Sequence, residues 1–219
     1  MSKVVIFGVK DFAELAHYYL TNDSEHEVVA FCVNRDYLPE SGEFHGLPVH
    51  AFETIEETFP PSEHAFFAPM SPANINFARA RVYASIKEKG YSCISYVSSK
   101  ATVCHNTIGE NCFILEDNTL QPFTTIGNNV VMWSGNHIGH HGSIADHVFF
   151  TSHVVLSGHC TVEPYCFFGV NATIRDGLTI AEGSFIAMAA AIMKDTEAWG
   201  VYRGNPGKKA DISSKDLKY

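Results

Sequence analysis

The chain has 219 residues, 46% hydrophobic and 18% charged, the composition of a globular protein with one large domain or two small ones. A formal net charge of −9 argues against a nucleic-acid surface or an anionic membrane as the main partner. The sequence contains no apolar run of about 18 residues, so we expect no membrane span, and the start, MSKVVIFGVKD, is not typical of a signal peptide.

The six cysteines show no C-x-x-C spacing. In a chain of this length, such cysteines are typical of small buried residues in a reducing compartment. We therefore expect a cytoplasmic protein without a disulfide framework.

The first 92 residues alternate between strand and helix patterns. Strands are predicted at 3–9, 27–33 and 64–70, and helices at 11–20, with Asp11 as N-cap, and 74–90. Residues 34–48, rich in Gly and Pro, are predicted to form a loop. The order predicts a small parallel sheet, with Gly8 at the first strand-to-helix turn, where nucleotides often bind. The G-x-G-x-x-G fingerprint is absent, which argues against a dinucleotide but leaves a mononucleotide contact open.

The second half follows a period of six. Every sixth residue from Ile108 to Ile192 is large and apolar, fifteen positions without an insertion. A fixed hexapeptide period is the signature of a parallel β-helix, whose stacked coils complete each other's core. We predict a small α/β domain at residues 1–92 and a β-helix domain at 93–219.

Half of the twelve histidines lie between residues 134 and 160. Three hexapeptides make one coil, so residues 18 apart stack about 4.8 Å from each other. His141 should therefore stack on His159, and His140 should lie under Gly158, which has no side chain to block it. His105 occupies the same point of its repeat two coils earlier.

Two kinds of chemistry fit this cluster. Converging imidazoles can hold zinc with an open position for water, as in the γ-type carbonic anhydrases of β-helix fold. That pattern needs a histidine pair five residues apart, and the fifth residue after His141 is Asp146. Alternatively, a neutral imidazole at His140 can act as general base in acyl transfer, with the Gly158 N–H stabilising the oxyanion.

A small α/β domain before a hexapeptide β-helix resembles the sugar acyltransferases of the sialic-acid O-acetyltransferase type, which include N-acetyltransferases of nucleotide-linked amino sugars. The resemblance implies a left-handed β-helix. The segment IGHHGSIADHVFF, residues 138–150, looks like the catalytic segment of the family. It implies that His140 is the base, with His141 in place of a frequent acidic residue and Phe149 in place of a frequent histidine. LSGHC, residues 156–160, implies Gly158 as oxyanion donor.

The first domain departs from the usual family pattern, because Asn34 and Arg35 replace frequent strand-end carboxylates. Our candidates for the nucleotide-sugar site are Gly8 at the first turn, Asn34, and Lys10 and Arg35, whose charges could meet a pyrophosphate; Asn136 would help His141 to position the base. Phe12 replaces a histidine of the usual first turn. The acyl-CoA groove would use Gly169, Asn171, Ala187, Ala189, Lys194, Gly204, Asn205 and Lys208.

These features predict an N-acyltransferase that moves an acyl group, most simply acetyl, from acyl-CoA to a nucleotide-linked amino sugar. The resemblance implies a homotrimer, and no metal cofactor is expected. A sugar O-acetyltransferase uses the same groups and remains an alternative. A zinc β-helix hydratase and a non-enzymatic scaffold that binds sugar nucleotides are the others.

Overall fold

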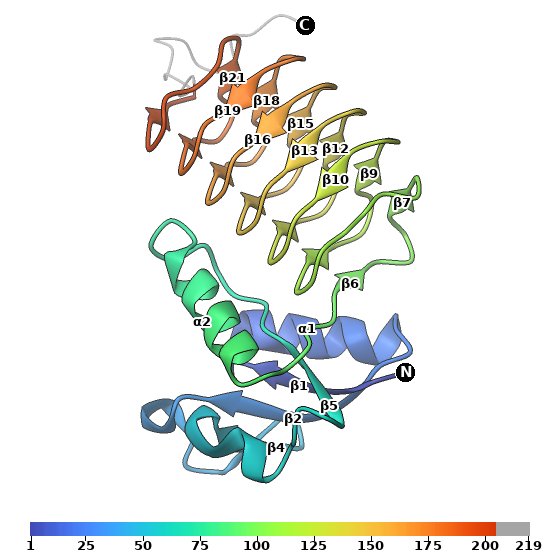
Figure 1. Ribbon diagram of the computed structural model, residues 1–219, viewed down its shortest axis with the longest axis vertical. Helices are drawn as coiled ribbons and strands as arrows, with labels where there is room; N and C mark the ends of the chain where they lie inside the picture. The colour runs from blue at the N-terminus through green and yellow to red at the C-terminus, as the bar shows by residue number, and fades with distance from the viewer. Residues whose placement is uncertain (205–219) are drawn as a thin grey trace, which may run out of the picture.

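The computed structural model describes residues 1–204, which form an α/β unit at one end and a stack of coils above it (Figure 1). The order β3-β4-β2-β1-β5 defines a five-stranded sheet, parallel except for the β3–β4 pair. Its strands are β1 (Lys3–Phe7), β2 (Glu27–Val33), β3 (Glu43–Phe44), β4 (Leu47–Ala51) and β5 (His64–Phe67). The helices are α1 (Asp11–Asn22) and α2 (Phe77–Glu88), and short 3-10 turns cover Arg35–Tyr37 and Phe52–Glu57.

The three predicted strands and two predicted helices of the α/β unit are present, with three corrections. The predicted loop 34–48 contains β3 and the start of β4, joined at Gly46, which has a φ of 76°. Pro48 precedes the residues of β4 that pair with β2, so its missing N–H removes no hydrogen bond between these two strands. Helix α2 begins at Phe77 rather than 74 because residues 74–76 have left-handed backbone. Lys10, not Asp11, is the N-cap of α1.

Residues 96–202 form a parallel β-helix of three sheets. One sheet contains β6 (Tyr96–Val97), β8 (Phe113–Ile114), β11 (Val131–Met132), β14 (Phe149–Phe150), β17 (Phe167–Phe168), β20 (Phe185–Ile186) and β22 (Val201–Tyr202). The second contains β7 (Thr102–Val103), β9 (Thr119–Leu120), β12 (His137–Ile138), β15 (Val155–Leu156), β18 (Thr173–Ile174) and β21 (Ala191–Ile192). The third contains β10 (Thr125–Ile126), β13 (Ser143–Ile144), β16 (Thr161–Val162) and β19 (Thr179–Ile180).

The hexapeptide period accounts for this architecture. Strand neighbours are 18 residues apart, as in the pairs His137–Val155 and Ile138–Leu156. The periodic apolar residues fill the interior, where all but Ile108 are buried. The prediction of stacked coils is confirmed, and the strand pattern extends beyond the sequence run at both ends, to β6 and β22.

The two parts of the chain share a core. Helix α1 lies between the five-stranded sheet and the first coils (Figure 1), and its Ala16 and Leu20 pack in one cluster with Phe113 and Val131 of the β-helix. Asp23, at the end of α1, accepts hydrogen bonds from the Tyr96 hydroxyl at 2.6 Å and the Ser99 N–H at 2.9 Å. The α/β unit is therefore held in one place against the coils. Among the described helices, none has the length and apolarity needed to cross a membrane.

Turns between the strands build three edges of the prism. The histidine edge consists of turns 121–124, 139–142, 157–160 and 175–178. The covered edge consists of turns 127–130, 145–148, 163–166 and 181–184 and faces α2. The third edge consists of turns 115–118, 133–136, 151–154, 169–172 and 187–190.

Candidate active site

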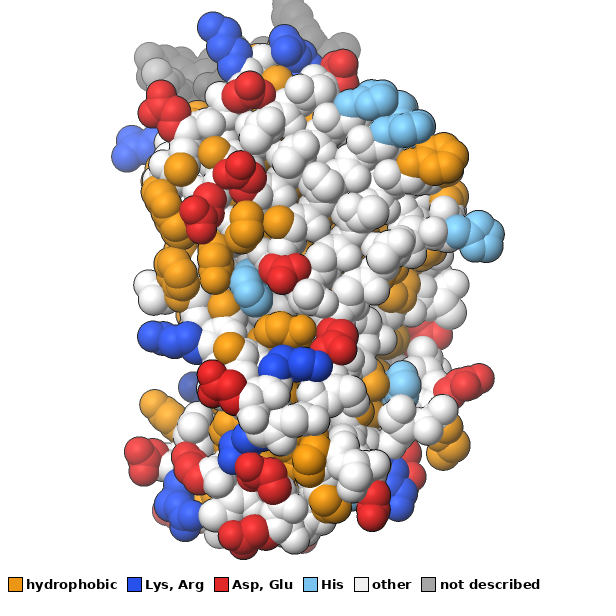
Figure 2. Space-filling model, viewed as in Figure 1, with side chains coloured by type: hydrophobic (Ala, Val, Ile, Leu, Met, Phe, Trp, Pro, Cys, Tyr) orange, Lys and Arg blue, Asp and Glu red, His pale blue; other side chains and the backbone are white. Residues whose placement is uncertain are grey.

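The histidine edge brings three imidazoles together at the surface. His140, His141 and His159 are all exposed, and Figure 2 shows histidine side chains gathered at one margin of the β-helix. The rings of His141 and His159 stack with centroids 5.2 Å apart and planes at 19°, which confirms the predicted stacking. Phe123, one coil below, lies 4.6 Å from the His141 ring and extends the column.

His140 lies against Gly158, as the register predicts. A Cβ atom built on Gly158 would lie 3.0 Å from His140 Cε1 and 3.1 Å from His140 Nε2. The backbone also couples the two coils, because the His159 N–H donates to the His140 carbonyl at 2.8 Å. Within residues 1–204, the Gly158 N–H has no hydrogen-bond acceptor. The His140 ring therefore contacts a residue whose backbone N–H has no acceptor within residues 1–204.

The other nitrogen of His140 is paired. His140 Nδ1 lies 2.9 Å from His141 Nδ1, a hydrogen-bond distance, so one of these two nitrogens carries the shared proton. A neutral imidazole has one N–H and one lone pair. When His140 Nδ1 carries the proton, the lone pair of His140 is on Nε2, beside Gly158. The arrangement can thus prepare His140 to accept a proton there.

Asn136 does not reach this cluster. It is buried on the third edge, where its amide donates to the Asn118 oxygen at 2.9 Å and its oxygen accepts from the Val154 N–H at 2.7 Å. These contacts hold successive coils together. Its burial and its bonds indicate an architectural asparagine, contrary to the expected role beside His141.

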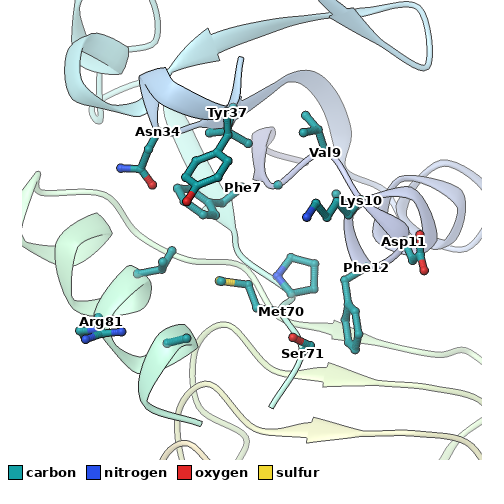
Figure 3. A pocket seen from close by; sticks show the side chains of 16 residues that line it. Phe7, Val9, Lys10, Asp11, Phe12, Asn34, Tyr37, Met70, Ser71 and Arg81 are labelled. Atoms are coloured by element: carbon teal, nitrogen blue, oxygen red, sulfur yellow. The ribbon is translucent and has the colours of Figure 1, made fainter. Parts of the chain in front are cut away.

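A separate cavity of about 700 Å³ opens at the carboxyl ends of β1 and β2. Gly8, Lys10 and Asn34, three of the predicted sugar-nucleotide residues, line it. Figure 3 shows the Lys10 ammonium group directed into the cavity and the Asp11 carboxylate directed away from it. The chain adds β2 and β4 on one side of β1 and then β5 on the other side, with all four strands parallel. The carboxyl ends of β1 and its neighbours therefore form the switch point at which α/β sheets bind ligands.

Among the lining residues that sequence reasoning missed, Tyr37 and Arg81 carry the groups best suited to bind a ligand. Tyr37 follows β2 in a short turn, and Arg81 stands on α2 across from Lys10 (Figure 3). The position of Tyr37 after a strand could have indicated it, whereas Arg81 depends on the packing of α2. Arg35 does not line the cavity. Its backbone N–H donates to the Glu53 carboxylate at 3.1 Å.

Phe12 also lines the cavity and connects it to the coils. Its ring meets Trp133 edge-on at 5.7 Å and lies 6.4 Å from Phe149. These partners belong to the third edge and to β14, away from the histidine edge. In a single chain, the cavity and the three histidines therefore lie on different sides of the β-helix.

The predicted acyl-CoA residues are also divided between the third edge and the column of His140. The third edge and the segment stacked on it hold Gly169, Asn171, Ala187, Ala189 and Gly204. A side chain at Gly169 or Gly204 would collide with the Met188 backbone, so the backbones approach closely there. Lys194 lies instead in the column of His140 and Gly158, three coils above His140. Asn205 and Lys208 lie outside the described residues.

No protein-family model and no curated protein matches the sequence. Solved structures do match it. A perosamine N-acetyltransferase variant from Caulobacter crescentus superposes with a TM-score of 0.80 at 16% identity, over 94% of this chain and 98% of that one. The acetyltransferase domain of PglB from Neisseria gonorrhoeae gives 0.78 at 17% identity, over 96% and 100%. WeeI from Acinetobacter baumannii gives 0.78 at 19%, over 95% and 99%.

These likenesses show the fold. The chain shares with these structures a small α/β unit followed by a left-handed parallel β-helix, over nearly its whole described length. The prediction of fold class is confirmed. At such low identity, the role of each residue must come from the chemistry of the site itself.

Proposed function

We propose that this protein transfers an acyl group, most simply acetyl, from CoA to the amino group of a nucleotide-linked sugar. The contact of His140 with Gly158 carries the proposal, because it joins a proton acceptor to a free backbone donor at an exposed edge. The structural neighbours support the class of reaction. The perosamine N-acetyltransferase variant is in complex with CoA and GDP-perosamine, and the PglB acetyltransferase domain also exists in complex with acetyl coenzyme A.

The reaction needs one base and one oxyanion donor. The amine nitrogen attacks the thioester carbonyl carbon while His140 Nε2 takes one of its protons. The carbonyl electrons move to the oxygen, which accepts a hydrogen bond from the Gly158 N–H. Collapse of this intermediate forms the amide and expels the CoA thiolate, which takes the proton from His140 Nε2 and restores the neutral base. His141 orients the base through the Nδ1–Nδ1 contact.

Direct attack is favoured over an acyl-enzyme intermediate. A cysteine nucleophile must be accessible and readily ionised. Cys160, the cysteine nearest to Gly158 along the chain, is buried, and burial raises the pKa of its thiol. Burial also raises the thiol pKa of Cys166, on the covered edge. Neither provides an activated thiolate beside His140.

The cavity at β1 is our proposed nucleotide site. Lys10 and Arg81 give it two cationic groups in a chain of strongly negative net charge, which favours a phosphate-bearing ligand. Tyr37 offers an exposed ring on which a base can stack. Gly8 and Asn34 add further polar groups to a largely apolar wall.

Separation of the two regions within one chain supports a shared site between copies. The histidine edge of one copy would face the third edge and the cavity of the next, as in the trimer that the sequence resemblance implies. Light scattering should then give three times the 24.2 kDa chain mass. A monomeric mass would contradict both the trimer and the shared site.

The deciding assay follows release of free CoA thiol from acetyl-CoA with a panel of UDP-, dTDP- and GDP-linked amino sugars. We expect release with one of them and a loss of about 10²–10⁴-fold in His140→Ala. His105→Ala is the matched control, since His105 is also exposed with left-handed backbone in the column of His141. A near-normal rate in His140→Ala would remove His140 from its role. The assay would then be repeated with nucleotide sugars that lack an amino group and with longer acyl-CoAs. Release of CoA thiol only with sugars that lack the amine would favour O-acylation. No release with any acceptor or acyl-CoA would favour a non-enzymatic scaffold.

A further inference from the structure

The histidine edge contains more imidazole than the proposed reaction uses. One ring nitrogen from each of His140, His141 and His159 lies within 4.8 Å of the others. The mechanism assigns roles to His140 and His141 and leaves His159 without one. The His140 ring is nearly perpendicular to the rings of His141 and His159, at centroid distances of 5.1 and 5.0 Å. The three rings therefore converge on one point and do not form a single stack.

This convergence is close to what a tetrahedral metal ion requires. Zinc–imidazole bonds of about 2.0–2.1 Å place neighbouring ligand nitrogens about 3.3 Å apart. The two Nδ1 atoms of His140 and His141 are already 2.9 Å apart. Because all three side chains are exposed, small rotations can bring the nitrogens to that spacing. Three imidazoles would leave the fourth position open to water.

We propose that a divalent transition-metal ion, with Zn²⁺ as the reference, binds reversibly to His140, His141 and His159 and switches off acyl transfer. The inhibitory part rests on the proposed function. When the ion takes the lone pair of His140 Nδ1, the proton of that neutral ring must be on Nε2. Nε2 then cannot accept a proton from the attacking amine.

The surroundings of the cluster favour reversible binding over a resident cofactor. Metal-bound histidines usually donate their other N–H to a carboxylate, carbonyl or water, and these partners strengthen the site. Within residues 1–204, neither His141 nor His159 has a carboxylate or carbonyl of the protein as such a partner. Phe123 and the stacked rings do hold the imidazole of His141 in place. The site is therefore partly preorganised, but no carboxylate or carbonyl in the described part of the chain supports these two ligands.

Metal binding can be measured without any substrate. Wild-type protein would be titrated with zinc chloride in competition with a chromophoric chelator, and we expect one ion per chain. His159→Asn should weaken binding more than about tenfold, since loss of even an outer partner commonly costs that much. Asparagine suits the left-handed backbone of residue 159, which has a φ of 59°. His105→Ala should bind like wild type.

Inhibition is measured on the acylated product by mass spectrometry, because Zn²⁺ also binds the CoA thiol. Zinc should abolish product formation by wild type, a chelator should restore it, and His159→Asn should stay active at the same zinc concentration. Absence of binding, binding unchanged in His159→Asn, or full activity of the zinc-loaded protein would each overturn the proposal. Binding that depends on His159 in a protein with no acyl-transfer activity would support the metal site and reject the proposed function instead.

Discussion

The histidine edge and the covered edge have the same local structure, with stacked rings on left-handed backbone, but differ in their exposure to solvent. His141 and His159 stack 5.2 Å apart on the first, and His147 and Tyr165 stack 5.1 Å apart on the second. All four residues have left-handed backbone, with φ between 54° and 65°. The first pair is exposed, whereas the second is half-buried beside Tyr83 and Phe77 of α2.

The difference lies in what covers each column. Arg79 of α2 is fully buried at the covered edge, where it donates to the Asn129 amide oxygen at 3.1 Å and the Val148 carbonyl at 2.8 Å. Burial lowers the pKa of Arg79, and burial and Arg79 together lower the pKa of His147. A stacked histidine is therefore not a functional signal by itself. It becomes one where its nitrogens remain open to a ligand.

The strongest test of the covered edge removes Arg79. Arg79→Ala leaves a cavity, deprives the Asn76 side-chain oxygen of its donor and removes one of two donors to the Asn129 and Val148 oxygens. We therefore expect a loss of about 3–5 kcal/mol in the free energy of unfolding. Arg79→Met fills more of the space and should lose less. Chemical denaturation measures both, and a wild-type midpoint for Arg79→Ala would show that this edge is not held by the arginine.

On the histidine edge, Gly158→Ala should damage activity more than stability. The new methyl group would press on the His140 ring at about 3 Å and shift the proposed base. We expect a fall of about 10- to 100-fold in kcat/KM. The free energy of unfolding should change by about 1 kcal/mol or less, because the backbone at residue 158 suits alanine. Ser157→Ala, at the neighbouring position, is the control, and equal rates in the two variants would contradict the role of Gly158.

A matched pair of histidine variants separates the two edges directly. His141→Ala loses the contact with His140 Nδ1 and should lower kcat about tenfold with little effect on folding. His141→Asp restores an acceptor for the His140 Nδ1–H and should recover the rate. His147→Ala loses its stacking on Tyr165 and its contact with Asn129, so it should cost about 1–2 kcal/mol of stability and leave the rate unchanged. The reverse assignment of effects would break the comparison.

The pH dependence of folding provides a further distinction. Because the pKa of His147 is lowered in the folded state, protonation favours the unfolded chain. The stability that His147 contributes is present above the ordinary imidazole pKa of about 6.5 and is lost as the pH falls below it. Denaturation midpoints between pH 7 and 5 should therefore decline less in His147→Ala than in wild type.

The smallest expected effect concerns the junction between the α/β unit and the coils. Hydrogen bonds from Ser99 and Tyr96 lower the pKa of the Asp23 carboxyl to about 2. The stability that this contact contributes is present above the unfolded pKa of about 4 and is lost as the pH falls toward 2. Asp23→Asn should cost about 1 kcal/mol or less at neutral pH, since the site is partly open to solvent. An equal pH dependence in variant and wild type would exclude Asp23 as its source.

The sequence determined the β-helix and the register of its columns. A six-residue period fixes which side chains enter the core, and a coil of 18 residues fixes which stack, so His140 under Gly158 and His141 under His159 follow from counting alone. The α/β order was also readable, because short apolar strands and helical spacing are local patterns. The β3–β4 hairpin was not, since Gly46 and Pro48 predict a loop unless the pairing with β2 is known.

Tertiary structure decided which columns are open. Rings stack in a column on both the histidine edge and the covered edge, and only the packing of α2, anchored by Arg79, buries the column of the covered edge. The same packing places Arg81 opposite Lys10 and forms the cavity at β1. The sequence also did not predict that Asn136 is buried on the third edge, where it donates a hydrogen bond to Asn118. The six-residue period predicts which coils stack on each other. The exposure of a side chain depends on the packing of segments that are distant in the sequence, which no local pattern predicts.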